Sequence, residues 1–367
     1  MSGEHVLLTG LPGLRARYVL RELLAGGDLV RVLVRIEDAE RVREVLAALP
    51  EAERARISIV EGNAASMDLG LSGKEFAALG AEIDRIHHVA ITTDTSLDRK
   101  AAEGINVGGA REILELAEAS TKLKALVFHS LAAVSGNREG FVREDDPIPD
   151  DGSRNLVEET LARAERMMRA AMPTVPIVVA RAGMILGDSR TGEIDRLDGF
   201  YLLVLLIMTS PRELALPLPS RGDAPLHLVP VDFVAKAACA IGRDSRAIGK
   251  TVHLVDPAPM PSRRVLEVVA QASGRRMGRG FIPANVTKAL LSAPGIDRIA
   301  RSPRSLLDVL ATRVAYGTET ADALLVGTGI ACPRFEAYAD VLVDHVRRRM
   351  DERRERRAAS TDYDPLV

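Results

Sequence analysis

Apolar and polar residues alternate along the first 190 residues in two kinds of run. Short runs rich in valine and isoleucine, with few charges, are typical of strands that are covered on both faces. Between them lie longer stretches with apolar residues at helical spacing, such as 13–27 and 106–120. Strands that alternate with helices predict an α/β fold with a doubly wound parallel sheet. The predicted strands cover residues 5–10, 30–35, 57–62, 85–90, 125–130 and 176–185.

The pattern changes after residue 190. A polar loop at 189–199 is followed by a strand and a helix within 216–242, then by a strand, a proline-containing turn and a helix within 250–274. Residues 280–350 predict mostly helix. Both signs of charge mix at 347–357, which predicts a solvated helix face, and 358–367 predicts a flexible tail.

Composition narrows the class of protein. The 367 residues are 47% apolar and 27% charged, so a large core can be buried. The net charge of -2 gives no sign of a surface that binds nucleic acid. Cys239 and Cys332 lie too far apart for a metal-ligand spacing and form no disulfide framework. We find no signal peptide, and the apolar run 201–208 is too short to span a bilayer. We therefore expect a cytoplasmic protein without a metal or a membrane span.

A glycine-rich turn joins the first strand to the first helix. In the sequence VLLTGLPGLRA, Gly10 permits a tight turn, Gly13 lets the backbone approach a pyrophosphate, and Ala16 lets the helix pack on the strand. The free N–H groups at the start of the helix would face the anion. Because the motif stands between a strand and a helix, it predicts a dinucleotide site.

The end of the second strand bears on the choice of dinucleotide. Arg35 stands where an NAD site usually carries an acidic residue, and a guanidinium suits the 2′-phosphate of NADP. Arg15 or Arg17 in the turn could assist, whereas Glu37 and Asp38 oppose this preference. We expect NADP(H) to be preferred over NAD(H).

Two further strands end close to the expected cofactor. Asn63 follows the third strand and either bonds the adenine or makes a turn. His88 and Ala90 follow the fourth strand, where small residues let the backbone pass close to the cofactor, and we expect His88 to be structural rather than catalytic.

These features resemble the extended short-chain dehydrogenase/reductase superfamily. The closest resemblance is to its branch of fatty acyl-CoA reductases and thioester reductase domains. The residues that carry it are TGLPGLRA (9–16), LVR (33–35), INVGGAREILELA (105–117), VFHSLAAVSG (127–136), GDSRTGEIDRLDG (187–199), LVPVDFVAKA (228–237), HLVDP (253–257) and GTGIACPRFEAYADVL (327–342).

The resemblance implies a Rossmann domain over 1–190 with 225–256, and a smaller, mostly helical substrate-binding region over 191–224 with 257–357. It also implies NADP(H), a small-molecule substrate and a homodimer formed through two helices. The cofactor-binding residues that we expect are Thr9, Gly10, Leu11, Pro12, Gly13, Leu14, Arg35, Asn63, Ala90, Asn106 and Arg181.

The catalytic residues that the resemblance implies are missing. The family uses a Ser or Thr, a Tyr, and a Lys four residues after the Tyr; the Tyr exchanges a proton with the substrate oxygen. Alignment on Ala164-Glu165 puts Val157 and Leu161 at the last two places, and the motif LAAVSG puts Leu131 at the first. Polar residues near the expected cleft are therefore weak candidates for catalysis, each with an ordinary structural explanation. They are Ser130, Ser135, Asn137, Arg143 and Glu158, with His129, Glu144 and Glu159 beside them.

Three functions remain open from the sequence. The first is an NADPH-dependent reductase of a hydrophobic carbonyl or acyl substrate with a non-standard active site, for which 200–208 could line the entrance. The second is a catalytically inactive NADP-binding sensor or partner-binding protein. The third is a redox-neutral cyclase or dehydratase, which no residue supports positively. We favour the first because both the cofactor turn and the substrate-side motifs persist.

Overall fold

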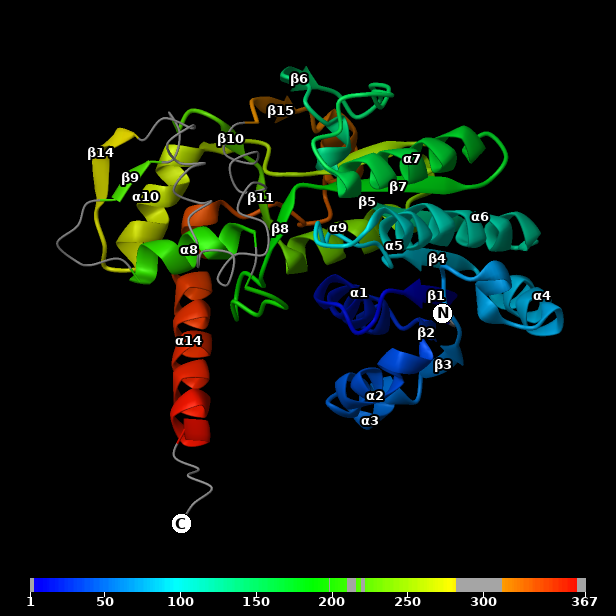
Figure 1. Ribbon diagram of the computed structural model, residues 1–367. Helices are drawn as coiled ribbons and strands as arrows, with labels where there is room; N and C mark the ends of the chain where they lie inside the picture. The colour runs from blue at the N-terminus through cyan, green and yellow to red at the C-terminus, as the bar shows by residue number, and fades with distance from the viewer. Residues whose placement is uncertain (1–2, 198, 210–215, 219–221, 282–311, 362–367) are drawn as a thin grey trace, which may run out of the picture. The chain divides into compact units, whose positions relative to one another are not determined.

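The computed structural model describes residues 3–197, 199–209, 216–218, 222–281 and 312–361 (Figure 1). Two compact units divide the chain. Unit 1 comprises residues 1–185, 227–258 and 314–332, and unit 2 comprises 186–226, 259–313 and 333–367. The sequence placed 314–332 in the substrate-binding region, whereas the contacts of these residues group them with unit 1.

Unit 1 is built on a seven-stranded parallel sheet in the order β12-β7-β5-β4-β1-β2-β3. The sheet confirms the predicted Rossmann-type α/β fold. Because the sheet is parallel, the carboxyl ends of β1, β4 and β5 meet at one edge, where ligands bind in folds of this type. The strands are β1 (His5–Thr9), β2 (Leu29–Val34), β3 (Ile57–Glu61), β4 (Arg85–His88), β5 (Ala125–Leu131), β7 (Ile177–Ala182) and β12 (Thr251–Leu254).

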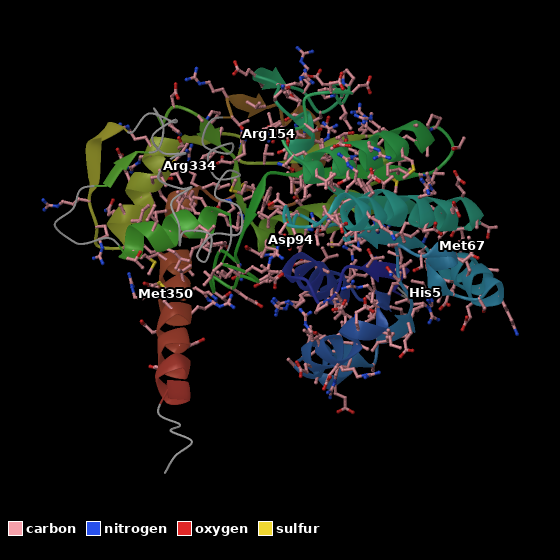
Figure 2. The ribbon with its side chains drawn as sticks, in the orientation of Figure 1. His5, Met67, Asp94, Arg154, Arg334 and Met350 are labelled. Carbon is pink, nitrogen blue, oxygen red and sulfur yellow. The ribbon has the colours of Figure 1, made fainter. Side chains whose placement is uncertain are left out.

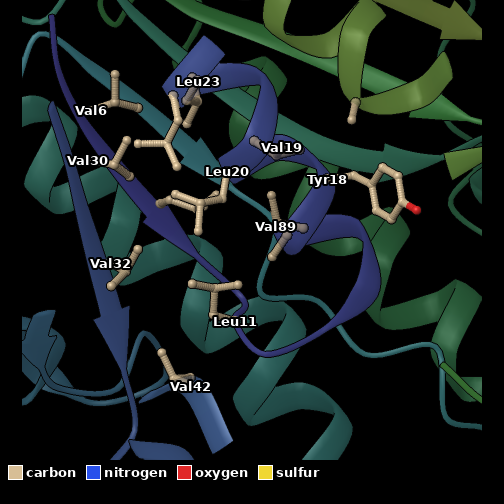
Figure 3. Close-up of a cluster of buried hydrophobic side chains, with 14 of the residues drawn as sticks. Val6, Leu11, Tyr18, Val19, Leu20, Leu23, Val30, Val32, Val42 and Val89 are labelled. Carbon is tan, nitrogen blue, oxygen red and sulfur yellow. The ribbon is translucent and has the colours of Figure 1, made fainter. Parts of the chain in front are cut away.

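Helices cover both faces of this sheet (Figure 1). One face carries α1 (Leu14–Ala25), α2 (Ala39–Ala47), α9 (Val231–Arg243) and α13 (Glu319–Leu325). The other face carries α4 (Gly73–Glu82), α6 (Gly109–Ala119) and α7 (Leu156–Ala171). Figure 3 shows how Leu20 and Leu23 of α1 pack over Val6, Val30 and Val32 of the first two strands. Burial of these aliphatic faces fixes α1, and with it the glycine turn, on the sheet.

Shorter elements of unit 1 lie in its connections. A two-stranded parallel ribbon pairs β6 (Gly140–Val142) with β15 (Val314–Tyr316), which is a strand within the region that the sequence predicted as mostly helical. A π-helical turn (Gly104–Gly108) precedes α6, and a 3-10 turn, η4 (Ala132–Ser135), follows β5. Other short elements of unit 1 include α3 (Glu51–Arg54), α5 (Arg99–Glu103) and β11 (Leu228–Pro230), and β8 (Met184–Leu186) ends one residue beyond it.

Unit 2 has a small core of aromatic and aliphatic side chains. Phe335 packs edge-to-face on Phe200 and on Tyr338, with ring centroids 5.9 and 5.4 Å apart. Its elements are α8 (Phe200–Thr209), β9 (Leu216–Leu218), β10 (Pro225–Leu226), β13 (Met260–Pro261), α10 (Ser262–Ala272), β14 (Met277–Phe281) and α14 (Ala339–Thr361). The helix α14 includes the first residues of the predicted tail, and 362–367 lie outside the described residues, as do 282–311.

The apolar stretch at 201–208 forms most of α8, of which Phe200, Leu203 and Val204 are buried. None of the helices in the described ranges combines the length and the apolar character that a membrane crossing requires. Within the same ranges, no cluster of three or more His, Cys, Asp or Glu side chains could hold a metal ion.

Candidate functional site

The glycine turn has the geometry that the sequence predicted for it. Gly10 has a φ of +100°, and a Cβ on it would stand 2.9 Å from the carbonyl carbon of Val89, so only glycine fits. The Gly13 N–H donates to the Gly10 oxygen at 3.0 Å, and α1 begins at the next residue without a side-chain cap. The Leu11–Pro12 peptide of the turn is cis. This bare backbone at a helix N-terminus fits the pyrophosphate of a dinucleotide.

Thr9 ties the end of β1 to the segment that follows β4. Its buried hydroxyl oxygen accepts the backbone N–H groups of Val89 and Ala90 at 3.1 and 3.0 Å. The hydroxyl proton is then left for Nδ1 of His88, 3.0 Å away. The structure thus gives His88 the structural place expected from the sequence.

Arg15 lies at the same edge of the sheet. Its guanidinium donates to the Val89 oxygen at 3.3 Å, and burial lowers its pKa to about 10. The group remains a cation at neutral pH, close to the glycine turn.

Arg35 is engaged by two acidic neighbours. Its Nε donates to Asp38 at 2.8 Å, and Nη1 lies 3.2 Å from Glu37. Asp38 is buried and also faces Arg41 at 3.3 Å. A 2′-phosphate at this place would have to draw Arg35 away from a carboxylate.

Two predicted cofactor-binding asparagines shape the backbone around the site. Asn63 accepts the N–H of Ala65 at 3.0 Å, which makes the turn that was one of its two predicted roles. Asn106 is fully buried and bonds the N–H and the oxygen of Thr92 at 2.8 and 3.3 Å, and the hydroxyl of Thr160 at 2.9 Å. It thereby anchors the segment after β4 to α7.

The residues that the sequence predicts at the family's catalytic places lie in one aliphatic cluster. Val157 and Leu161 of α7 are 6% and 0% exposed and pack with Val134, Ile148 and Ala162. Leu131, at the end of β5, and Ile91, after β4, pack against this cluster while remaining partly exposed. The side chains of this cluster are all aliphatic, so none of them could donate a proton.

Ser130 and Arg181, predicted respectively for catalysis and for the cofactor, meet in a buried network. Ser130 donates to Glu165 of α7 at 2.5 Å, and Nε of Arg181 donates to the same carboxylate at 2.7 Å. Nη1 of Arg181 also lies 3.4 Å from His253. Since Ser130, Glu165 and Arg181 are at most 3% exposed, the network holds α7 on the sheet.

Of the other polar candidates, some lie on the surface and some are buried in ion pairs or hydrogen bonds. Asn137 and Arg143 are exposed. Glu158 is buried and pairs with Arg154, labelled in Figure 2, whose Nε donates to it at 3.0 Å. Glu159 pairs with Arg99 at 2.7 Å on the surface of α7.

Two more of the candidates are buried. Glu144 accepts the backbone N–H groups of His253 and Ala321 at 2.8 and 3.1 Å, and burial raises its pKa. Nε2 of His129 lies 3.1 Å from Nδ1 of His87, and burial lowers the pKa of both imidazoles.

Ser135 contacts Tyr316, a residue that the sequence did not indicate as a candidate. Its Oγ lies 2.9 Å from the phenol oxygen of Tyr316, 181 residues later, and this hydroxyl donates to the oxygen of Ala132 at 3.0 Å. Tyr316 has no lysine four residues on, and no local pattern links 316 to 135. The pairing of β6 with β15 creates the contact, and no signal in the sequence predicted that pairing.

Comparison with known proteins assigns the family. Residues 8–238 match the NAD-binding family described as Male sterility protein. The chain belongs to this family, and with it to the reductase branch of the extended short-chain dehydrogenase/reductase superfamily. The predicted superfamily and branch are thereby confirmed.

Curated relatives are much longer than this chain. The chain is 30% identical over 269 residues to a linear gramicidin synthase of Brevibacillus parabrevis, covering 69% of this chain and 5% of that protein. It is 29% identical over 286 residues to a carboxylic acid reductase of Mycobacterium tuberculosis, covering 69% of this chain and 24% of the relative.

Solved reductase domains share the fold. The terminal R domain of the myxalamid PKS-NRPS pathway has a TM-score of 0.80 at 27% identity, covering 95% of this chain and 92% of that one. The R domain of a nonribosomal peptide synthetase from Mycobacterium tuberculosis has a TM-score of 0.69 at 22% identity, covering 94% and 91%.

Proposed function

We propose that this chain is an NADPH-dependent reductase of a hydrophobic carbonyl or acyl group that works without the family's Tyr-Lys pair. The observation that carries the proposal is the glycine turn, which leaves the N-terminus of α1 without a side-chain cap directly after Gly13. Uncapped N–H groups at a helix start suit the pyrophosphate of a dinucleotide, and the turn stands in a chain of an NAD-binding family.

Cationic groups at two places favour NADPH within this proposal. Arg35 lies at the end of β2, and Arg15 lies at the start of α1. Arg35 would exchange Asp38 for the 2′-phosphate, while Thr9 and Arg15 hold the backbone after β4 in place for the rest of the cofactor. When bound, the nicotinamide supplies a hydride.

The apolar surroundings favour a hydrophobic substrate. Leu131 and Ile91 stand at the carboxyl ends of neighbouring strands and remain partly exposed above the buried Val157 and Leu161. An acyl chain could bury itself against such side chains at roughly 25 cal/mol for each Å² removed from water. The names of the relatives, a carboxylic acid reductase and the R domains of peptide synthetases, favour an acyl or carbonyl carbon as the hydride acceptor.

A second candidate function is a non-catalytic NADP-binding protein. The observation that favours it is the dense packing of Val157 and Leu161 where the family keeps its proton donor. On this alternative the cofactor would bind and would not be consumed.

One pair of measurements separates the candidates. Calorimetric titration with NADPH and with NADH tests binding, and absorbance at 340 nm follows NADPH in the presence of a long-chain acyl-CoA or the matching aldehyde. The reductase predicts tight NADPH binding and formation of the aldehyde or alcohol, identified by mass spectrometry. Binding without turnover of any lipophilic carbonyl would favour the second candidate, and failure to bind either nucleotide would overturn both.

A further inference from the structure

A phenol hydroxyl lies beside the vacated catalytic place. Tyr316 Oη is 3.0 Å from the oxygen of Ala132, which directly follows Leu131, the residue at the family's Ser/Thr place. The partner of that phenol, Ser135, ends the 3-10 turn η4 after β5. Both hydroxyls therefore lie at the carboxyl edge of the parallel sheet, the edge that also carries the glycine turn.

We propose that Tyr316, supported by Ser135, donates the proton that the carbonyl oxygen of the substrate needs. This inference rests on the proposed reductase function and names its missing acid. The donor would come from β15 instead of α7, and would replace the lost Tyr-Lys pair with a Tyr-Ser pair.

The ring of Tyr316 is held on two sides by imidazoles. His227 and His253 meet it edge-on, with ring centroids 4.9 and 5.2 Å away. His253 is itself fixed, because Nδ1 lies 2.8 Å from the oxygen of Gly317 and its backbone N–H donates to Glu144. Nδ1 and Nε2 of His227 lie 2.9 and 3.2 Å from the oxygens of Asp256 and Val314, and the neutral ring donates to one of the two. A ring clamped in this way has a fixed position, while its hydroxyl proton can still rotate.

The hydrogen bonds give that proton a defined starting point. Tyr316 has one proton, which it donates to Ala132, so Ser135 donates its own proton to Oη. Tyr316 is partly exposed, and rotation of the hydroxyl would turn its proton from Ala132 toward a carbonyl oxygen placed beside it. Burial raises the pKa of Tyr316, so the phenol carries its proton at neutral pH.

The reduction needs one hydride, which the cofactor supplies, and one proton, which Tyr316 supplies. As the carbonyl carbon gains a hydride, the C–O π bond opens and its oxygen takes the proton from Oη, which gives the alcohol. The phenolate that remains keeps the hydrogen bond from Ser135, and the positive charges of Arg154 and Arg181 favour it, while Glu158 opposes it. A proton from solvent then restores the phenol.

Three variants test the proposal in the full chain. Tyr316→Phe removes only the hydroxyl and keeps the ring between the two imidazoles. Ser135→Ala removes the supporting donor. Tyr18→Phe is the matched control, because Tyr18 is buried on α1 with its hydroxyl pointing away from the cluster in Figure 3. Each variant is assayed for kcat and KM across pH with a long-chain aldehyde, and for the NADPH dissociation constant by calorimetry.

A readout without turnover accompanies the kinetics. Tyrosinate absorbance at 295 nm is titrated between pH 8 and 12, and the difference between wild type and Tyr316→Phe isolates one phenol. We expect it to titrate above the ordinary value of 10, and to move higher still in Ser135→Ala, because the hydrogen bond from Ser135 lowers the pKa.

A general acid at Tyr316 predicts a distinct set of kinetic effects. Tyr316→Phe should lower kcat by about 100-fold or more with unchanged NADPH binding, and should abolish the high-pH limb of the kcat profile. Ser135→Ala should move that limb to higher pH, and Tyr18→Phe should match wild type. Should Tyr316→Phe stay within threefold of wild type with an unaltered profile, the inference fails and the reductase function stands. A wild-type chain that reduces no carbonyl overturns both.

Discussion

Leu161 lies one helical turn after Val157 on α7, and both side chains are buried in the same aliphatic cluster. The sequence predicts that these are the places of the family's Lys and Tyr. In the structure both side chains contribute to the hydrophobic core. Restoring the family's residues is therefore a test of stability before it is a test of catalysis.

We expect Leu161→Lys to destabilise unit 1 by roughly 3–5 kcal/mol, because it places an unpaired ammonium at a fully buried site. Burial favours the neutral amine, so the unfolded chain binds the proton more tightly and the variant should regain stability as the pH rises toward about 10. Urea unfolding at pH 7 and pH 9.5 measures both effects. Met67→Lys is the control, since Met67 (Figure 2) is 80% exposed and the same change there should cost under about 0.5 kcal/mol. Equal losses in the two variants would contradict the burial argument.

Much of the fold could be predicted from the sequence, because its signals are local. The six Val- and Ile-rich runs coincide with six of the main strands or parts of them, and the strand predicted within 250–274 coincides with β12. The GxxGxxA spacing placed the turn before α1. The sequence also indicated that Asp38 opposes the NADP preference, because it lies only three residues from Arg35, and the structure pairs the two side chains. Such features depend on neighbours in the chain, which periodicity and turn chemistry report directly.

The candidate site depended instead on contacts between distant segments. Tyr316 reaches Ser135 because β15 pairs with β6, and a strand of three residues within a stretch that predicts helix leaves no periodic signal. Glu144 was a catalytic candidate because it is a carboxylate near the expected cleft, yet it bonds backbone groups more than 100 residues away. Its residue type and its place in the sequence suggested a catalytic role for Glu144. Only the packing shows that it anchors the backbone.

Cofactor preference should depend on the competition between Asp38 and a phosphate for Arg35. Arg35→Ala removes a charge-assisted pair, so we expect NADPH affinity to fall about 10- to 100-fold and NADH affinity to change little. Asp38→Asn removes the competing charge and should raise NADPH affinity about two- to fivefold. Calorimetric titration with both nucleotides measures these changes.

Arg41→Ala serves as the control for this prediction. Arg41 also pairs with Asp38, but its side chain is 70% exposed and it stands on α2, beyond the end of the strand. Its loss should leave the ratio of NADPH to NADH affinity within about twofold of wild type, an estimate based on the small worth of exposed ion pairs. A drop in this ratio equal to that of Arg35→Ala would mean that the local positive charge matters and the position does not.

Acid should unfold unit 1 through its buried histidines. Burial, and then the charges of Arg85 and Arg243, lower the pKa of His87 to about 3, and burial and Arg15 lower the pKa of His88 to about 3. In the unfolded chain these imidazoles have their ordinary pKa of 6.5. Above that pH they are neutral in both states, so their burial costs the folded protein no stability. The free energy of unfolding declines steadily as the pH falls from 6.5 toward 3, by about 1.4 kcal/mol per pH unit for each histidine.

His87→Asn tests this acid sensitivity, since it keeps a polar partner for His129 and removes one titrating group. Between pH 4 and 6 the slope of unfolding free energy against pH should be shallower than in wild type by about 1.4 kcal/mol per unit. His5→Gln changes a partly exposed histidine and provides the comparison. An unchanged slope in His87→Asn would show that other groups control acid unfolding.

Glu144 should determine how firmly the segment 314–332 is held in unit 1. Its carboxylate accepts the N–H groups of Thr320 and Ala321 at the start of α13, and that of His253 on β12. Glu144→Ala leaves the buried N–H groups of His253 and Ala321 unpaired at about 1–3 kcal/mol for each of them, and removes the acceptor of the half-buried Thr320. Because the same segment carries Tyr316, loosening it should separate the phenol from Ser135. Hydrogen exchange followed by mass spectrometry should show faster exchange across 314–325 and no change in α4.

Glu139→Ala is the matched control for this prediction, as Glu139 directly precedes β6 while Glu144 follows it, and Glu139 is exposed. Glu144→Gln separates charge from geometry, because the amide can still accept one or two of the N–H bonds and should protect the segment better than alanine does. If Tyr316 is the proton donor, kcat should fall in the order Glu144→Gln then Glu144→Ala, in step with the exchange rate at 314–325. Faster exchange without any loss of kcat would separate the anchoring role of Glu144 from catalysis and remove Tyr316 from the reaction.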